Sequence, residues 1–316
     1  MRVVFMGTPE FGIPPLEHLL LSQHEVVAVY TPPDKPAGRG RALASSPVKR
    51  AAEKMGLPVV QPDSLKTAEA LAGLADFSPE AIVVAAYGQI LPPAVLALPR
   101  WGCLNIHPSL LPKFRGASPV AGAILAGDEF AGVSIMLLDR GMDTGPVFAR
   151  GQIGISAGDT TGTLTAKLSI IGARLLQEVL VYWPRGELSP QPQNGAEATY
   201  TAPIVKGDGE INWHLSAVEI WRRVRAFQPW PGCYTGWQGK QLKIIEAEPV
   251  PSGGETEVGR VVPLSLPGGQ KVGFGVVTGS GILGVITVQP EGKRPMSAGE
   301  FIRGQRQFVG EKLGKP

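Results

Sequence analysis

Asn105, His107 and Asp143 are the residues of this chain whose types and spacing could carry out chemistry. Asn105 and His107 stand two positions apart at the end of an apolar run, and side chains at this spacing on an extended strand point to one face. Pro108 favours an extended backbone at the histidine before it. An amide, an imidazole and a carboxylate that meet around a carbonyl carbon suit acyl transfer, in which hydrogen-bond donors stabilise a developing oxyanion.

Asp143 lies in the sequence R-G-M-D-T-G, a glycine-bracketed loop that directly follows the apolar run at residues 133–138. If this run and the strand of His107 are neighbours, the carboxylate could orient or charge the imidazole. On spacing alone, a histidine at a strand end is more often a structural group, and the third polar residue is what favours a site. Ser109 lies outside any G-x-S-x-G motif and Cys103 has no evident partner, so we expect direct transfer to an incoming nucleophile.

Strand-length apolar runs alternate with helical stretches over the first 183 residues. Residues 81–86 are apolar without alternation, which is typical of a strand covered on both faces. The alternation predicts an α/β domain: a Rossmann-like, mostly parallel sheet with helices on both faces. Strands are expected at residues 3–6, 25–30, 58–60, 81–85, 102–106 and 133–138, and helices at residues 14–21, 46–56, 68–74, 119–126 and 163–183.

The second part of the chain predicts a different, smaller domain. The chain's 316 residues suit two domains, and residues 184–194 contain three prolines and two glutamines, as a linker would. Five short strands are expected at residues 233–237, 242–247, 259–262, 271–277 and 283–288, after a helix at 216–227. Such a series favours a small OB-like β-barrel. We therefore expect a catalytic domain at residues 1–189, a linker at 190–207 and a β-barrel domain at 208–316.

Composition excludes several classes of protein. With 43% hydrophobic and 18% charged residues, the chain can bury a core and is no disordered tail. No apolar stretch is long enough to cross a bilayer and the N-terminus has no signal-peptide core, so we expect no membrane partner and a cytoplasmic protein. The sequence G-T-P-E-F-G at residues 7–12 lacks the dinucleotide fingerprint. Cys103 and Cys233 offer neither a disulfide framework nor a metal-ligand spacing, so buried free thiols and no metal site are expected.

Positive charge is concentrated locally. The chain carries a net charge of only +3, but five basic residues stand against one acid, Asp34, at residues 34–50. Such a segment favours a polyanion, although a solvated loop is equally compatible with charge alone.

Two linked motifs resemble those of the 10-formyltetrahydrofolate-dependent formyltransferases. Residues 105–112 meet the family pattern N-x-H-x-S-L-L-P and are followed by F-R-G-A-S-P, and residues 139–145 meet D-x-G-x-D-T-G. R-A-F-Q-P-W-P-G at 225–232 and Y-T-A-P-I-V-K at 200–206 are similar to the family's entry into its C-terminal barrel. The resemblance covers essentially the whole chain. Pro108 and Asn212 depart from residues common in the family, outside the trio.

The resemblance implies transfer of the formyl group of 10-formyltetrahydrofolate to the α-amine of initiator methionyl-tRNA, for translation initiation. Asn105 and protonated His107 would donate hydrogen bonds to the oxyanion. Asp143 would hold His107 and help to remove the amine proton. The residues that would line the folate pocket are Ala86, Tyr87, Gly88, Gln89, Ile90, Leu91, Ser109, Leu110, Leu111, Pro112 and Asp139.

The basic loop after the second strand resembles the loop that marks the tRNA-dependent members of the family. Its residues Lys35, Arg39 and Arg41, together with Lys49, would bind tRNA, and a monomer is expected. Alternatives remain a formyltransferase acting on a glycinamide ribonucleotide or an amino sugar, a formyltetrahydrofolate hydrolase, and a nucleic-acid-binding protein without this activity.

Overall fold

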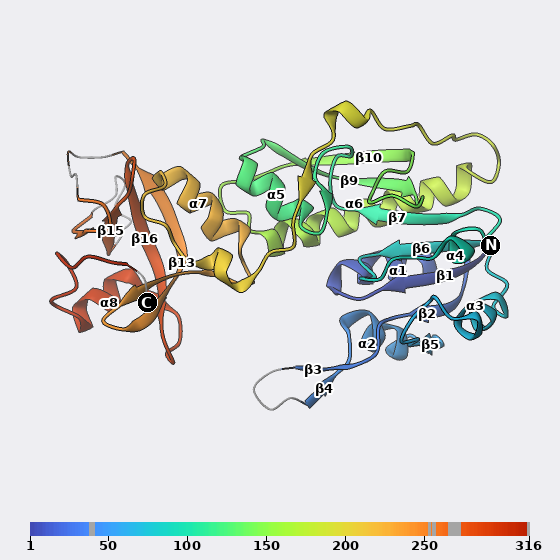
Figure 1. The fold of residues 1–316 in the computed structure, drawn as a ribbon, viewed down its shortest axis with the longest axis horizontal. Coiled ribbons are helices and arrows are strands. Elements are labelled where there is room, and N and C mark those ends of the chain that lie inside the picture. Colours follow the sequence, from blue (N-terminus) through green and yellow to red (C-terminus); the bar gives the residue numbers. More distant parts are fainter. Residues whose placement is uncertain (38–41, 252–253, 255–256, 265–272, 315–316) are drawn as a thin grey trace. The chain divides into compact units, whose positions relative to one another are not determined.

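A seven-stranded sheet forms the centre of the first part of the chain (Figure 1). The structure is a computed structural model, and it describes residues 1–37, 42–251, 254, 257–264 and 273–314. Its strand order is β10-β9-β7-β6-β1-β2-β5. The strands from β5 to β7 are parallel, whereas β9 is antiparallel to β7, and β10 to β9. The expected Rossmann-like, mostly parallel sheet is confirmed. The strands are β1 (Arg2–Gly7), β2 (Glu25–Tyr30), β5 (Val59–Val60), β6 (Ala81–Ala85), β7 (Cys103–His107), β9 (Phe130–Leu137) and β10 (Val147–Gly154).

Helices cover both faces of this sheet, and side-chain alternation along the strands decides which face each residue joins. Val4 and Met6 pack in one core cluster with residues of α3 (Ala68–Ala75) and α4 (Pro93–Leu96). Cys103 belongs to this cluster too, so Asn105 and His107, two and four residues further along β7, face the same side. The other face carries α1 (Ile13–Leu20), α2 (Pro47–Lys54) and most of α6 (Thr161–Tyr182).

Short elements complete the first unit. Ser46 caps α2, as its position before Pro47 predicts, by accepting a hydrogen bond from the backbone N–H of Lys49. The sequence did not predict the small hairpin in the basic segment or the two-residue strands that pair near the end of β7. These elements are η1 (Glu10–Gly12), β3 (Lys35–Ala37), β4 (Ala42–Ala44), β8 (Arg115–Gly116), η2 (Gly195–Glu197) and β11 (Tyr200–Thr201).

The second unit is built on an antiparallel sheet of order β12-β13-β16-β15-β14, with β17 paired to β16. The C-terminal segment bridges its two edges, pairing Gly314 with Gly236 and Lys312 with Arg260, so the sheet closes into the expected small barrel. Phe274, Phe301 and Phe308 pack edge to face with Trp237 or with each other. The elements are α5 (Pro119–Ala126), η3 (Lys206–Gly209), α7 (Ala217–Ala226), β12 (Cys233–Trp237), β13 (Lys240–Val250), β14 (Val261–Val262), β15 (Phe274–Val277), β16 (Ile282–Pro290), β17 (Met296–Ser297) and α8 (Ala298–Gly304).

The two units are not continuous in sequence. Unit 1 comprises Met1–Pro119, Glu129–Gly154 and Leu164–Ala202, and unit 2 comprises Val120–Asp128, Ile155–Thr163 and Pro203–Pro316. Most of the segment expected as a linker, residues 190–202, therefore packs within unit 1. The reason is hydrogen bonding, since Gln191 pairs with Val147 and β11 pairs with β8. No helix of the described ranges is both long and apolar enough to cross a membrane.

Candidate active site

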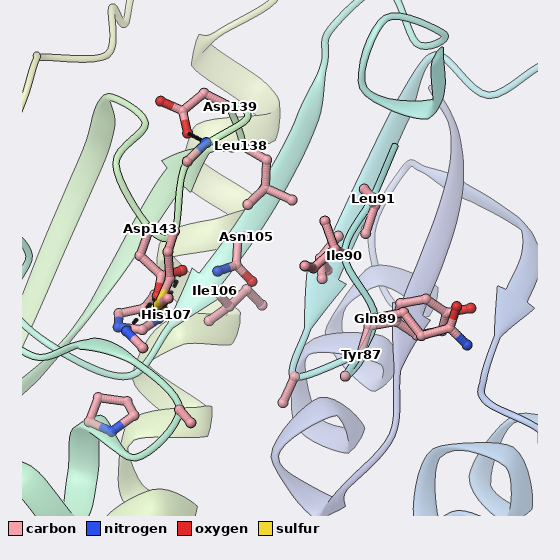
Figure 2. A pocket seen from close by; sticks show the side chains of 18 of the residues that line it. Tyr87, Gln89, Ile90, Leu91, Asn105, Ile106, His107, Leu138, Asp139 and Asp143 are labelled. Carbon is pink, nitrogen blue, oxygen red and sulfur yellow. Dashed lines mark hydrogen bonds and ion pairs between the residues drawn. The ribbon is translucent and has the colours of Figure 1, made fainter. Parts of the chain in front are cut away.

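A cavity of about 750 Å³ opens in unit 1 at the carboxyl ends of β6 and β7 (Figure 2). Ligands of open α/β sheets bind at this edge. Asn105, His107 and Asp143 all line it, so the structure brings the three expected catalytic residues together. The full lining comprises Val84, Ala86, Tyr87, Gly88, Gln89, Ile90, Leu91, Leu96, Asn105, Ile106, His107, Pro108, Gly116, Ala117, Pro119, Leu138, Asp139, Arg140, Gly141, Met142 and Asp143.

Asn105 presents an unused amide to this cavity. The residue is only 9% exposed. Within the described part of the chain it has no side-chain hydrogen-bond partner, although buried amides are normally paired. An amide group held on a central strand, with no partner among the residues that the structure describes, is available to donate to a ligand oxygen.

His107 and Asp143 form the second half of the site. The Nδ1 atom of His107 lies 3.7 Å from Oδ1 of Asp143, and its Nε2 lies 3.1 Å from the carbonyl oxygen of Phe114. Because a carbonyl only accepts, Nε2 carries a hydrogen. Burial lowers the pKa of His107, and the Asp143 carboxylate and the Phe114 carbonyl oppose that shift. The imidazole therefore becomes a cation only at the cost of desolvation, which its two oxygen neighbours reduce.

The loop before β10 is held in shape by its own polar residues. Asp139 accepts hydrogen bonds from the backbone N–H of Gly141, at 3.0 Å, and from the hydroxyl of Thr144, at 2.7 Å. Asp143 has a left-handed backbone, with φ at 53°, and its Oδ2 accepts from the N–H of Gly116 at 2.8 Å. These contacts fix the direction of the Asp143 carboxylate.

Seven of the eleven residues expected to line a folate pocket do line the cavity. Six form the loop after β6, Ala86 to Leu91, and the seventh is Asp139. Ile90, which is labelled in Figure 2, lines the cavity and is 86% exposed, so few protein atoms pack against this apolar side chain. An apolar rim side chain of this kind suits contact with a flat ring of a ligand.

The other four, Ser109, Leu110, Leu111 and Pro112, are not part of the cavity wall. The chain turns away after Pro108 and is held against β9, where the Ser134 hydroxyl donates to the carbonyl of Ser109 and accepts from the N–H of Leu111. Leu111 packs in a small core with Met136 and Val147. In this position the turn supports the strand that carries Asn105 and His107, and contact of these four residues with a folate stays a prediction.

The basic residues expected to bind tRNA fall into three groups. Lys35 is exposed on β3. Lys49 is not free, because its ammonium lies 2.7 Å from Oδ2 of Asp34 and 2.7 Å from Oε1 of Gln61. Hydrogen bonding from Lys49 and Gln61 lowers the pKa of Asp34. Lys49 thus anchors the base of the β3–β4 hairpin. Arg39 and Arg41 lie outside the described residues.

Sequence reasoning missed several residues of the site. Gly116, whose N–H binds Asp143, and Met142 both line the cavity. Gln193 donates to two carbonyls of the Asp143 loop from the segment expected to be a linker. The motif F-R-G-A-S-P marked the position of Gly116, whereas no local pattern marked Gln193. Within the described ranges no group of three or more His, Cys, Asp or Glu could hold a metal ion.

Two family models match the chain. The model described as "Formyl transferase" matches residues 1–180, and "Formyl transferase, C-terminal domain" matches residues 203–306. A methionyl-tRNA formyltransferase of Dehalococcoides mccartyi (strain ATCC BAA-2266 / KCTC 15142 / 195) is 50% identical over 316 residues, 99% of each chain. One of Roseiflexus sp. (strain RS-1) is 47% identical, over 99% of this chain and 95% of the relative.

Solved structures show the same fold at lower identity. HypX from Aquifex aeolicus in complex with tetrahydrofolic acid matches with a TM-score of 0.63 at 17% identity, over 99% of this chain, which spans 48% of HypX. Methionyl-tRNA formyltransferase from Clostridium thermocellum matches with a TM-score of 0.57 at 18% identity, over 82% of this chain and 96% of that one. With both halves matched by the family models and relatives at about half identity along the full length, this chain belongs to the formyl transferase family.

Proposed function

We propose that this chain transfers the formyl group of 10-formyltetrahydrofolate to the α-amine of methionine esterified to initiator tRNA, giving N-formylmethionyl-tRNA. The observation that carries the proposal is the 50% identity, along 99% of both chains, to a protein named methionyl-tRNA formyltransferase. The cavity that gathers an amide, an imidazole and a carboxylate supports it. This combination suits attack of an amine on a formyl carbon, because it offers donors for the oxyanion and an acceptor for the amine proton.

Asn105 supplies the donor for the oxyanion in this mechanism. As the amine attacks, the formyl carbon becomes tetrahedral and its oxygen gains negative charge, toward which the unpartnered amide donates a hydrogen bond. Both ring nitrogens of His107 already face protein oxygens, Phe114 O and Asp143 Oδ1. Protonated His107 would add its positive charge beside the oxyanion, and its Nδ1–H, which lies beyond hydrogen-bond distance of Asp143, would donate to the oxygen. Asp143 would stabilise that charge and accept the amine proton, directly or through water. As the oxyanion collapses, the bond from the formyl carbon to the folate nitrogen breaks, and this nitrogen takes up the proton and leaves with the tetrahydrofolate.

The cavity has room and chemistry for a folate. Its volume of about 750 Å³ lies in the range of sites for small organic ligands. Leu91, Leu96 and Val84 give it apolar walls, and Gln89 and Asp139 add polar groups at the lining. Residues 86–91 and Asp139 would hold the donor, which supplies the formyl group when it is bound.

The tRNA would be bound by two regions. Lys35, with Arg39 and Arg41 of the same loop, would contact the tRNA phosphates near the acceptor end. Residues 208–316, a barrel domain with 13 basic and 9 acidic residues after position 208, would bind further along the molecule. Residues 1–189 would carry the catalytic site. We expect the enzyme to act in the cytoplasm as a monomer.

Mass spectrometry of methionyl-tRNA incubated with the protein and 10-formyltetrahydrofolate tests the proposal. We expect the methionine to gain one formyl group, and Asn105→Ala to abolish most of the gain. Parallel reactions with glycinamide ribonucleotide, an amino-sugar nucleotide and water as acceptors test the other members of the family. A formyl group on one of these acceptors, with methionyl-tRNA unchanged, would refute the proposed acceptor.

A further inference from the structure

Gln193 holds the loop that carries Asp143. Its Nε2 donates one hydrogen bond to the carbonyl of Asp143, at 2.8 Å, and one to the carbonyl of Gly145, at 2.7 Å. An amide nitrogen has two hydrogens, so both are used within this loop. The two bonds fix the backbone beside Asp143, which has a φ of 53° that non-glycine residues rarely adopt.

The amide of Gln193 can lie in only one orientation. Its Oε1 accepts from Nη2 of Arg115, at 2.8 Å, and from Nε, at 3.2 Å. Guanidinium groups only donate and carbonyls only accept, so turning the amide over would set donor against donor and acceptor against acceptor. Arg115 is itself 5% exposed and donates to the hydroxyl of Tyr200 at 3.3 Å. Arg115 thus fixes the orientation of the Gln193 amide, and the Gln193 amide in turn fixes the Asp143 loop.

The same stretch of chain also supports the other partners of the His107–Asp143 pair. The hydroxyl of Thr199 accepts from the N–H of Phe114 at 2.8 Å, and the carbonyl of Phe114 accepts from Nε2 of His107. Strand β11 pairs with β8, which contains Gly116, the N–H donor to Asp143. Residues 193–201 therefore brace Phe114, Gly116 and the backbone of Asp143, three of the groups that orient the pair.

We propose that Gln193 is a positioning residue for formyl transfer, holding the Asp143 loop so that the carboxylate faces His107. The proposal rests on the proposed function only for the consequence in turnover. The effect on the His107–Asp143 pair is measurable without any substrate. The positioning role of Gln193 can therefore fail its test while the proposed function holds, and the reverse.

The first test is the titration of the His107 ring, followed by NMR. The chain has four histidines, and His107→Gln identifies the signal. We expect Gln193→Met, which keeps the length of the side chain and removes its hydrogen bonds, to lower the midpoint of His107 toward the value in Asp143→Asn, because a facing carboxylate stabilises the imidazolium. Gln191→Met is the matched control: Gln191 lies two residues away, is exposed, and its side chain donates to the carbonyl of Ser189.

The second test is turnover, with Gln193→Glu beside Gln193→Met. The glutamate keeps the pairing with Arg115 but has no hydrogens to donate to the two carbonyls. Urea unfolding of this variant shows whether it is folded, so that a loss of turnover is not caused by misfolding. We expect both variants to lose at least tenfold in kcat, with KM for the folate within about threefold of wild type. An unchanged His107 midpoint in Gln193→Met, or wild-type kcat in the folded Gln193→Glu, would overturn the proposal.

Discussion

The Nδ1 atom of His107 lies 3.7 Å from Oδ1 of Asp143, although β7, which ends at His107, and β9, which precedes Asp143, run in opposite directions. Strands β7 and β9 are antiparallel, with Leu104 opposite Leu137, so the chain leaves β9 beside the start of β7. Residues 138–146 fold back to bring Asp143 to the end of β7. The distance between His107 and Asp143 therefore depends on the contacts that hold this loop as well as on the two side chains.

Replacing Asn105 should slow the chemical step far more than it weakens donor binding. The amide is unpartnered among the described residues, so its removal costs the folded protein no internal hydrogen bond. Loss of one oxyanion donor typically costs 10²- to 10³-fold in kcat, about 3 to 4 kcal/mol. We expect Asn105→Ala to show such a fall in steady-state formylation, with KM for the folate within about threefold. Equal losses in kcat and in folate affinity would instead indicate a binding role.

Asp143→Ala should have the same kinetic signature, because in the proposed mechanism its carboxylate stabilises the protonated His107 and accepts the amine proton. The matched control for both variants is Asn212→Ala. Its side-chain oxygen lies in an exposed turn of unit 2, where it accepts from the N–H of His214. This variant should keep wild-type kcat.

Burial of His107 should make the folded state sensitive to acid. The folded-state pKa of His107 is lowered, whereas the unfolded chain titrates near 6.5. Between these two values the unfolded chain binds a proton that the folded chain does not. The contribution to stability is therefore fully present above pH 6.5 and is lost as the pH falls toward the folded-state pKa, by about 1.4 kcal/mol for each unit of lowering.

Urea unfolding between pH 7.5 and 5 checks this expectation. The free energy of unfolding should fall less steeply with acid in His107→Gln than in wild type. His24 provides a second case, because burial and the N-terminal amine lower its pKa as well, so His24→Gln should remove a separate share of the slope. Superimposable pH profiles for wild type and His107→Gln would contradict the burial argument.

Side-chain alternation was enough to predict one half of the site from the sequence. Asn105 and His107 share a face because they stand two apart on a strand, and β7 (Cys103–His107) has the expected position. The approach of Asp143 could only be stated as a condition, since it needs the pairing of β7 with β9. The position of the turn at residues 109–112 could not be predicted from the sequence. Its distance from the cavity depends on Ser134, 25 residues beyond Ser109, and no local pattern marks such a contact.

Two segments were not predicted from the sequence, one because its composition is not typical of a strand and the other because distant contacts hold it. Strand β10 contains Gly151 and Gly154 and, after its first two residues, alternates partly buried with exposed residues along a sheet edge, so neither its composition nor an apolar run marked it. The segment at 190–202 has the prolines of a linker, yet Gln193 and β11 tie it to unit 1 through side-chain and strand contacts distant in sequence.

Gly145→Ala should disrupt the Asp143 loop from its other end. A Cβ atom on Gly145 would lie 1.8 Å from the carbonyl oxygen of Leu137, so the backbone must move. We expect a loss of about 1 to 3 kcal/mol in the free energy of unfolding and at least a tenfold fall in kcat. Gly154→Ala is the matched control, because a Cβ there meets no atom within 4 Å. Equal stability and turnover of the two variants would show that the close approach does not constrain the loop.

Lys35 and Lys49 should differ in how their removal affects tRNA binding. Lys35 is exposed, so a phosphate contact by its ammonium would release a counterion, and Lys35→Ala should flatten the log-log slope of affinity against salt by roughly 0.7 to 0.9. The ammonium of Lys49 is already paired with Asp34. Lys49→Met should therefore weaken binding by loosening the hairpin while leaving the salt slope unchanged, as should Asp34→Asn. Titrations of tRNA binding at several salt concentrations check this difference, and an equal flattening for both lysines would show that Lys49 reaches a phosphate.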